Sequence, residues 1–157
     1  MDSLYILNMQ NNATSGLTQA QLQFVDEFAT LLSVWNMPNN AARLYGYLQI
    51  REEPASMDEI ARDLEMSRSN VFNAAKLLEQ HGNARRVGER GSKRIRFVAG
   101  DDPGLPLRAQ TEALGRTAAL LAANCKTVAQ GASAARLSRL ARFHVELKAA
   151  MEKVIFP

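Results

Sequence analysis

Apolar side chains recur every three or four residues over the first third of the chain, which is the spacing of amphipathic helices. Thr18 and Gln21 have the spacing of a capping box in front of the first apolar stripe, which predicts a helix over 18–36. A second stripe follows Pro38 and predicts a helix that Pro54 ends. Two helices are therefore expected before Pro54.

Two further helices are expected immediately afterwards. Ser56 and Glu59 have the spacing of a second capping box, and the stripe behind them is long enough for two or three turns. Ser67 is the expected N-cap of a helix over 68–80, whose apolar positions again step by three and four. Gly82 suits the left-handed conformation that often follows a last helical turn. A short helix, a turn and a longer helix are thus predicted.

The hydrophobic period then changes. Residues 85–87 and 95–98 read as short strands, and the glycines between them predict a hairpin tip. Beyond the Asp/Pro/Gly-rich segment 101–106, stripes with heptad spacing predict long helices over 106–130 and 133–155. The predicted fold class is mainly α with a small β-hairpin.

Composition narrows the class of protein. A chain of 157 residues that is 46% apolar can bury roughly 70% of its unfolded surface without a disulfide or metal. Cys125 is the single cysteine, and no Cys/His cluster has metal-ligand spacing, so no cofactor or metal is expected. The N-terminus lacks the basic start of a signal peptide, and no apolar stretch is long enough to span a membrane. We therefore expect a cytoplasmic protein without a membrane partner.

The formal net charge of +3 is unevenly distributed along the chain. Residues 1–66 carry 3 Lys/Arg and 9 Asp/Glu, residues 67–98 carry 8 and 2, and residues 99–157 carry 8 and 5. The net charges of these segments are −6, +6 and +3, which sum to +3. The basic character is therefore concentrated in the fourth helix and the hairpin.

A short helix, a turn, a capped helix and a basic two-stranded ribbon form the order of a winged helix-turn-helix. The capped helix suits the major groove of double-stranded DNA, where Arg and Asn can each read a base edge. Cations of the hairpin suit phosphates or the narrow minor groove. The predicted recognition residues are Ser67, Arg68, Ser69, Asn70, Asn73 and Lys76. The predicted wing residues are Arg85, Arg86, Arg90, Lys93, Arg94 and Arg96.

The segment 37–100, with a proline-led helix that contains Tyr-Gly-Tyr-Leu at 45–48 before the helix-turn-helix, resembles MarR-type transcriptional regulators, most closely the GbsR branch. The resemblance implies a winged domain over 37–100, with a recognition helix at 68–80. It also implies an obligate homodimer, in which the flanking regions 1–36 and 101–157 provide the dimerisation helices. The apolar positions expected at the dimer interface are Leu22, Val25, Leu114, Leu121, Leu137, Leu140 and Leu147.

Several residues allow both a functional and a purely structural interpretation. Trp35, Tyr45 and Tyr47 are candidates to line a pocket for a small-molecule effector, although core packing is the favoured role of each. Cys125 lies on an apolar stripe and is expected to be a small buried side chain rather than a redox sensor. Phe72 is expected to pack under the wing, with contact to a thymine methyl group as the alternative.

No catalytic motif accompanies these features. The sequence has no Gly-rich phosphate loop, no nucleophile elbow and no His-based metal motif, so an enzyme is not expected. The prediction is a regulator that binds a pseudo-palindromic DNA operator as a homodimer. The alternative is a winged-helix module that binds proteins, or nucleic acid without sequence preference, and the basic hairpin favours the first of these two.

Overall fold

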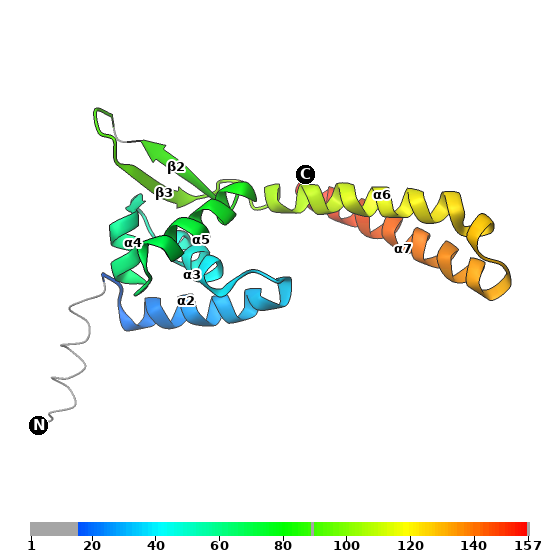
Figure 1. Cartoon of the computed structure of the whole chain (residues 1–157), viewed down its shortest axis with the longest axis horizontal. Helices are drawn as coiled ribbons and strands as arrows, with labels where there is room; N and C mark the ends of the chain where they lie inside the picture. The colour runs from blue at the N-terminus through cyan, green and yellow to red at the C-terminus, as the bar shows by residue number, and fades with distance from the viewer. Residues whose placement is uncertain (1–15, 89, 157) are drawn as a thin grey trace, which may run out of the picture. The chain divides into compact units, whose positions relative to one another are not determined.

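The computed structural model describes residues 16–88 and 90–156, which form two compact units that meet in sequence at Asp101 and Asp102. The N-terminal segment that was read for a targeting signal, and Glu89 of the wing, lie outside the described residues. The helices of the first unit are α2 (Gln19–Leu32), η1 (Ser33–Trp35), α3 (Asn39–Gln49), α4 (Met57–Asp63) and α5 (Arg68–Gln80), and its strands are β1 (Ala55–Ser56), β2 (Ala84–Gly88) and β3 (Ile95–Ala99) (Figure 1). The second unit consists of α6 (Leu105–Val128) and α7 (Gly131–Ile155).

The predicted starts of the capped helices in the first unit are confirmed, whereas the first helix, expected to run to residue 36, ends as α2 at Leu32 and is followed by η1. Both capping boxes form, because the Thr18 and Ser56 hydroxyls each accept a hydrogen bond from the backbone three residues later, and Gln21 and Glu59 accept one in return. The Ser67 hydroxyl accepts from the backbone N–H of Asn70 at the start of α5. Local chemistry therefore fixes where the two helices of the helix-turn-helix begin.

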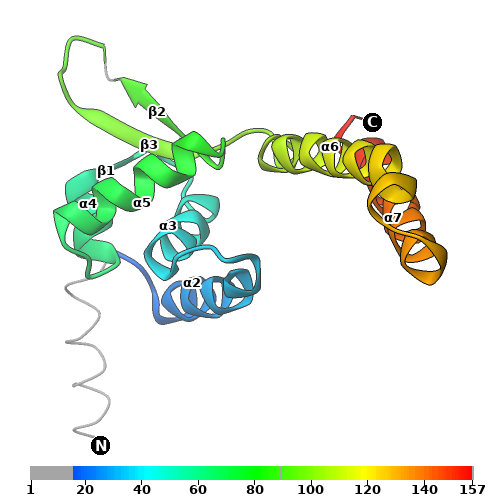
Figure 2. The ribbon, with the colours of Figure 1, turned by 45° about the vertical axis from the view of Figure 1, so that its right-hand side comes forward.

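The sheet has three antiparallel strands in the order β1-β3-β2, where the sequence predicted a two-stranded hairpin (Figure 2). Ser56 of β1 lies opposite Arg96 of β3, and Val87 of β2 lies opposite Arg96 on the other side. The second helix was expected to run to Pro54, but α3 ends at Gln49. The residues that follow α3 instead lead into β1, whose pairing with β3 competes with helix continuation.

The core of the first unit is formed by apolar side chains from α2, α3, α4 and α5 and from the sheet. Phe97 attaches β3 to this core with 2% of its surface exposed, and Val25 attaches α2 with none. The other large members of the core are Leu44, Tyr47, Leu48, Ile60, Leu64, Val71 and Leu78. Helix α5 and the strands of the β2–β3 hairpin are therefore packed on one shared core.

A buried carboxylate connects three segments of this unit. Asp63, at the end of α4, accepts hydrogen bonds from the Tyr47 hydroxyl (2.9 Å), the Gly16 backbone N–H (2.9 Å) and the Arg62 guanidinium (3.0 Å). Burial of the phenol, together with the hydrogen bond to Asp63, raises the pKa of Tyr47, so its hydroxyl stays protonated and donates. The contact fixes α4 against α3 and against the start of α2.

The second unit is an antiparallel pair of long helices with few buried side chains. Thr111, Ala118, Ala141 and Ile155 are the buried positions of α6 and α7. Cys125 was expected to be buried, but in the single chain it is only partly buried. No helix in the described ranges 16–88 and 90–156 is long and apolar enough to cross a membrane.

Candidate nucleic-acid interface

One face of α5 points into the core and the other is open to solvent. Val71, Ala74, Ala75 and Leu78 are buried, which fixes the rotation of the helix about its axis. All six predicted recognition residues are exposed: Ser67, Arg68, Ser69, Asn70, Asn73 and Lys76. The amphipathic pattern thus places the polar side chains of the first turns together on the free face of the helix.

Two contacts shape the first turn of this face. The Ser67 hydroxyl caps the helix and lies 3.1 Å from the Ser69 hydroxyl. The Arg68 guanidinium lies 3.1 Å from the Asp58 carboxylate of α4, and both side chains are largely exposed. An exposed ion pair contributes little to stability. Arg68 is therefore free to exchange Asp58 for another anion at small cost.

A groove of about 440 Å³ runs between the start of α3 and helix α5. Asn70, Asn73 and Lys76 line it from α5, and Pro38 and Asn40 line it from the other side. These side chains offer amide donors, amide acceptors and one ammonium group. On the α5 side these polar groups lie beside the apolar Ala74 and Leu77, so the groove combines hydrogen-bonding groups of the kind that contact base edges and phosphates with an apolar floor.

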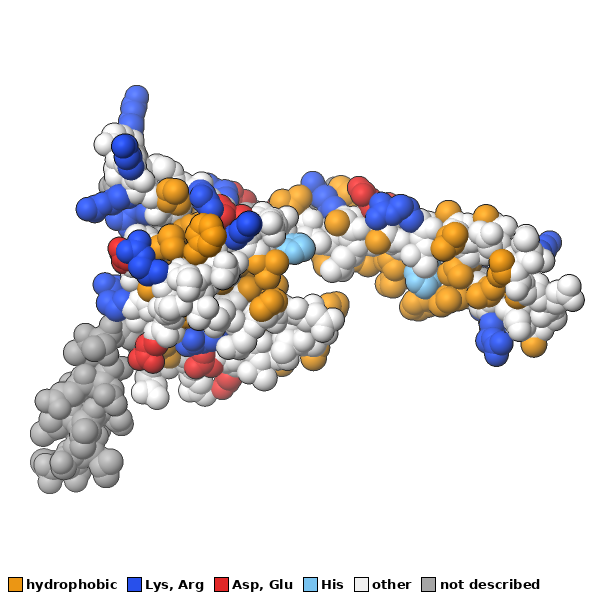
Figure 3. Space-filling view, viewed as in Figure 1, with side chains coloured by type: hydrophobic (Ala, Val, Ile, Leu, Met, Phe, Trp, Pro, Cys, Tyr) orange, Lys and Arg blue, Asp and Glu red, His pale blue; other side chains and the backbone are white. Residues whose placement is uncertain are grey.

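The β2–β3 hairpin extends beyond the helices of its unit (Figure 1), and Lys and Arg side chains gather at its tip (Figure 3). Arg90, Lys93 and Arg94 are exposed, and within the described part of the chain none of the three has an ion-pair partner. Gly91 has a φ of 82°, a left-handed conformation that glycine adopts readily in the tip. The tip therefore carries three cations available to an anionic partner.

The other three wing cations lie on the paired strands of the hairpin and form ion pairs. Arg85 contacts Asp101 (3.0 Å), Arg86 contacts Glu79 of α5 (2.7 Å), and Arg96 contacts Glu59 of α4 (3.1 Å). The hydrogen bond to Glu79 raises the pKa of the Arg86 guanidinium, so that arginine stays charged. Hydrogen bonds from Ser56, with the charges of Arg96 and Arg51, lower the pKa of Glu59. The six predicted wing cations thus separate into two sets.

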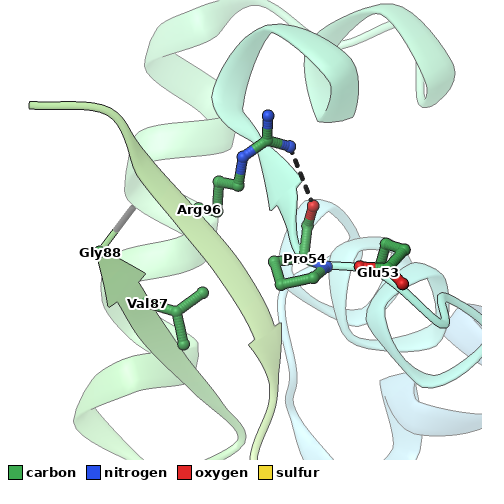
Figure 4. Close-up of a pocket in the computed structure, with 5 residues that line it drawn as sticks. All are labelled: Glu53, Pro54, Val87, Gly88 and Arg96. Carbon is green, nitrogen blue, oxygen red and sulfur yellow. Dashed lines mark hydrogen bonds between the residues drawn. The ribbon is translucent and has the colours of Figure 1, made fainter. Parts of the chain in front are cut away.

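A second hollow of about 500 Å³ lies beside the ends of β2 and β3 that adjoin the hairpin tip (Figure 4). Glu53, Pro54, Val87, Gly88 and Arg96 line it, and Arg96 donates a hydrogen bond to the Pro54 carbonyl oxygen (3.2 Å). The acidic Glu53 and the basic Arg96 give the hollow mixed charge. Its lining comes from β2, β3 and the loop before β1.

The three aromatic residues predicted for an effector pocket are not brought together. Trp35 is 72% exposed at the end of η1, and Tyr47 is fully buried in the core. Tyr45 packs on the Phe28 ring, with 5.8 Å between ring centroids. None of the three lines either hollow described above. Tyr47 has the core role that the sequence favoured and Tyr45 packs against the core, but the same prediction is wrong for Trp35, which is exposed.

The structure contradicts the prediction for Phe72 and places the two histidines at helix positions. Phe72 was expected to pack under the wing, but it is 47% exposed on α5. His81 is the C-cap residue of α5, and Gly82 follows it with a φ of 75°, as the sequence predicted. In the second unit, His144 Nδ1 lies 2.8 Å from the Leu140 carbonyl oxygen. The described residues hold no group of three His, Cys, Asp or Glu side chains suited to a metal ion.

The predicted dimer residues are distributed over both units. Leu22 is partly buried and Val25 is fully buried in the core of the first unit, which gives Val25 a role within one chain. Leu140 and Leu147 are exposed on α7. Leu114, Leu121 and Leu137 are partly buried along the α6–α7 hairpin.

Sequence reasoning missed residues on two surfaces: the exposed apolar stripe of α7 and the acidic partners of the arginines near α5 and the wing. Phe143 (57% exposed) and Val154 (78% exposed) share the α7 stripe of Leu140 and Leu147, and the i, i+3, i+7 spacing was the available signal. Asp58, Glu59 and Glu79 contact the predicted DNA-binding arginines. Helical spacing could not identify those three contacts, because each joins two different elements.

The arrangement of α4, α5 and the β2–β3 hairpin is that of a winged helix-turn-helix protein. A solved structure described as a transcriptional regulator has the same fold, with a TM-score of 0.70, 19% identity, and coverage of 87% of this chain and 95% of that one. The predicted fold class is thereby confirmed.

The chain is also similar in sequence to the HTH-type transcriptional repressor GbsR of Bacillus subtilis, with 25% identity over 93 residues. This match covers 59% of the chain and 51% of GbsR, so the chain spans about half the length of the curated relative it matches. No family model matches the chain. The resemblance to the GbsR branch that the sequence suggested is confirmed by this similarity.

Proposed function

We propose that the protein is a DNA-binding transcriptional regulator that acts as a homodimer and has no enzymatic activity. The observation that carries the proposal is the exposed polar face of α5, directly followed by a hairpin whose tip bears three cations without described ion-pair partners. The similarity to a transcriptional repressor supports this assignment. A protein-binding winged helix would not need this concentration of positive charge.

In the proposed complex, α5 enters the major groove and the wing follows the adjacent backbone. Arg68, Asn70 and Asn73 can present paired hydrogen-bonding groups to guanine or adenine edges. Ser67, Ser69 and Lys76 flank them and suit contacts to phosphate oxygens or bases. Arg90, Lys93 and Arg94 at the tip suit phosphates or a narrow minor groove.

The second unit supports the homodimer. Helices α6 and α7 have 24 and 25 residues, yet four of their side chains are buried in one chain. Leu140, Phe143, Leu147 and Val154 form an exposed apolar stripe on α7 (Figure 3 shows apolar side chains along this hairpin). A second copy of the same hairpin would bury these stripes in a four-helix arrangement. Two recognition helices would then meet half-sites about one helical turn apart.

The proposal is tested by titrating the full chain against the intergenic DNA upstream of its own gene and against a scrambled duplex, at two salt concentrations. We expect tight binding to the intergenic duplex and weaker, strongly salt-dependent binding to the scrambled one. Equal weak binding to both duplexes would contradict operator specificity. Absence of binding to either duplex at low salt would favour the protein-interaction module.

The dimer is tested independently by static light scattering of the DNA-free protein at micromolar concentration. The expected mass is twice that of the 17.3 kDa chain. A single-chain mass under these conditions would remove the basis for paired half-sites. Modulation by a small molecule would act by changing the spacing of the two recognition helices, and it stays a prediction.

Asn73→Ala should reduce sequence discrimination more than overall affinity. Asn73 is exposed in the groove beside α5, and a bidentate contact to a base is worth about 1–3 kcal/mol of discrimination. The measurement compares dissociation constants on the intergenic and scrambled duplexes. Arg94→Ala is the matched control, and it should weaken binding to both duplexes by a similar factor. Equal losses for both variants on both duplexes would refute this division of roles.

Asp58→Asn should strengthen DNA binding. The Asp58 carboxylate lies 3.1 Å from the Arg68 guanidinium and is exposed beside the recognition helix, where it competes with a DNA anion for Arg68. An exposed ion pair is worth roughly 0.2–1 kcal/mol, so the affinity should rise by a factor of about 1.4 to 5. Asp26→Asn provides a control, because Asp26 of α2 pairs with Arg43 of α3, and neither residue belongs to the predicted DNA interface. Weaker binding after Asp58→Asn would show that this ion pair positions Arg68 for DNA.

A further inference from the structure

We propose that Arg86 and Arg96 are positioning residues that clamp the wing onto the two helices of the helix-turn-helix, while the tip residues Arg90, Lys93 and Arg94 contact DNA. This inference rests on the proposed function for its DNA-binding consequence. Its structural part, the clamp itself, concerns the free protein and can be tested without DNA.

The first half of the clamp joins β2 to the recognition helix. Arg86 Nε lies 2.7 Å from a carboxylate oxygen of Glu79, in the last turn of α5. The Arg86 guanidinium also lies 5.8 Å from the ring centroid of Phe97, which is buried on the neighbouring strand. One arginine therefore contacts α5 and the sheet at the same time. Its position sets β2 against the C-terminal turn of the helix.

The second half joins β3 to α4. The Arg96 guanidinium donates to Glu59 (3.1 Å) and to the Pro54 carbonyl oxygen (3.2 Å). Glu59 also accepts from the Ser56 backbone N–H (2.7 Å) in the capping box that begins α4. Ser56 itself lies opposite Arg96 in the β1–β3 ladder. The same carboxylate thus caps the first helix of the helix-turn-helix and holds the central strand of the sheet.

These contacts distinguish the two sets of wing cations. Arg96 and Glu59 are each 31% exposed, and in the other pair Arg86 is 45% and Glu79 is 22% exposed, so each ion pair has at least one partly buried member. The three tip cations are exposed. A wing that moved freely relative to α5 would lose binding energy in ordering itself on DNA. Two ion pairs, one on each wing strand, order the wing in the free protein and so reduce the free-energy cost of ordering it on binding to DNA.

Substitution of the acidic partners, Glu59 and Glu79, tests the clamp most clearly. It breaks each ion pair while all the arginines and lysines that could contact DNA stay in place. Glu79→Gln removes the pair to Arg86. Glu59→Gln removes the charge opposite Arg96 but keeps a side chain that completes a capping box with Ser56. Arg94→Gln is the matched control at the tip. Hydrogen exchange of the full-length, DNA-free protein is measured for each variant, together with its urea unfolding midpoint.

We expect both acid variants to raise exchange of the β2–β3 amides about two- to fivefold, the range for a partly exposed ion pair, with nearly unchanged unfolding midpoints. Arg94→Gln should leave wing exchange unchanged. The charge-swapped double variant Glu79→Arg with Arg86→Glu should restore wild-type exchange. Unchanged wing exchange in both acid variants would overturn the clamp, whatever the DNA assays show.

DNA binding gives the second readout, with the intergenic and scrambled duplexes as probes. A clamp predicts that Glu59→Gln and Glu79→Gln weaken binding to both duplexes about two- to fivefold while the salt slope stays the same. If Arg86 and Arg96 instead contacted phosphates directly, the same variants would bind DNA more tightly, because each arginine would have lost the carboxylate that competes with the phosphate. If the wild-type protein binds neither duplex, the proposed function fails while the exchange result still decides the clamp.

Discussion

Phe97→Ala should destabilise the first unit by about 3–5 kcal/mol, the cost of deleting a buried aromatic side chain. Phe97 is 2% exposed and attaches the central strand β3 to the core that also holds α5. The cavity would lie beneath the wing, so the β2–β3 hairpin should lose protection first. Urea unfolding followed by far-UV circular dichroism measures the change, and hydrogen exchange locates it.

Phe72→Ala is the matched control for this prediction. Phe72 is the same residue type in the same unit, but it is 47% exposed on α5. Its truncation should cost about 1 kcal/mol or less. Similar losses for the two phenylalanines would show that the wing is not anchored through Phe97.

Asp63→Ala should cost about 3 kcal/mol, near the lower end for breaking a buried charged contact. The substitution leaves the buried Tyr47 hydroxyl and the Gly16 N–H without the carboxylate that accepts from them. The value lies at the lower end because the Arg62 side chain is 57% exposed and can be solvated by water. Urea unfolding midpoints provide the measurement.

A graded series separates the charge from the hydrogen bonds. Asp63→Asn keeps an acceptor for Tyr47 and should cost less than Asp63→Ala, while Tyr47→Phe leaves the carboxylate in place and should cost about 1–3 kcal/mol. If Asp63→Ala unfolded at the wild-type urea concentration, the contact would have no part in holding α4 to α3.

Local signals in the sequence predicted most of the first unit correctly. The Thr18–Gln21 and Ser56–Glu59 capping boxes, the Ser67 cap and the left-handed Gly82 all form as expected, because each depends on residues within four positions of one another. The same holds for the exposed face of α5, since helical periodicity fixes it once the apolar stripe is known.

Features that depend on distant partners could not be predicted in this way. The strand β1 has two residues and exists through its pairing with β3, about forty positions further along the chain. The pairing of Arg86 with Glu79 and of Arg96 with Glu59 likewise depends on how the hairpin folds back onto the helices. In the sequence all six wing cations therefore appeared equally available to DNA, although three of them form ion pairs with carboxylates of the same chain.

The start of the last helix was also placed incorrectly. Ser133 was the expected boundary residue, but α7 begins at Gly131 and its N-cap is Gln130, whose side chain makes no capping hydrogen bond. Serine is a frequent cap and also a tolerated helix residue, so its presence alone does not define a boundary. At Ser56 the ambiguity was absent, because Glu59 has the spacing that completes a capping box. At Ser67 the preceding turn of the helix-turn-helix marked the boundary.

The central claim is that the α5 face and the wing tip form a DNA interface, and the salt dependence of binding tests it most directly. The affinity of the wild-type protein for the intergenic duplex is compared with that of a variant with Arg90→Ala, Lys93→Ala and Arg94→Ala over a range of salt concentrations. The slope of log affinity against log salt should fall by about 0.9 for each phosphate that the variant no longer neutralises. An unchanged slope, with the fold intact by circular dichroism, would contradict a DNA interface at the wing tip.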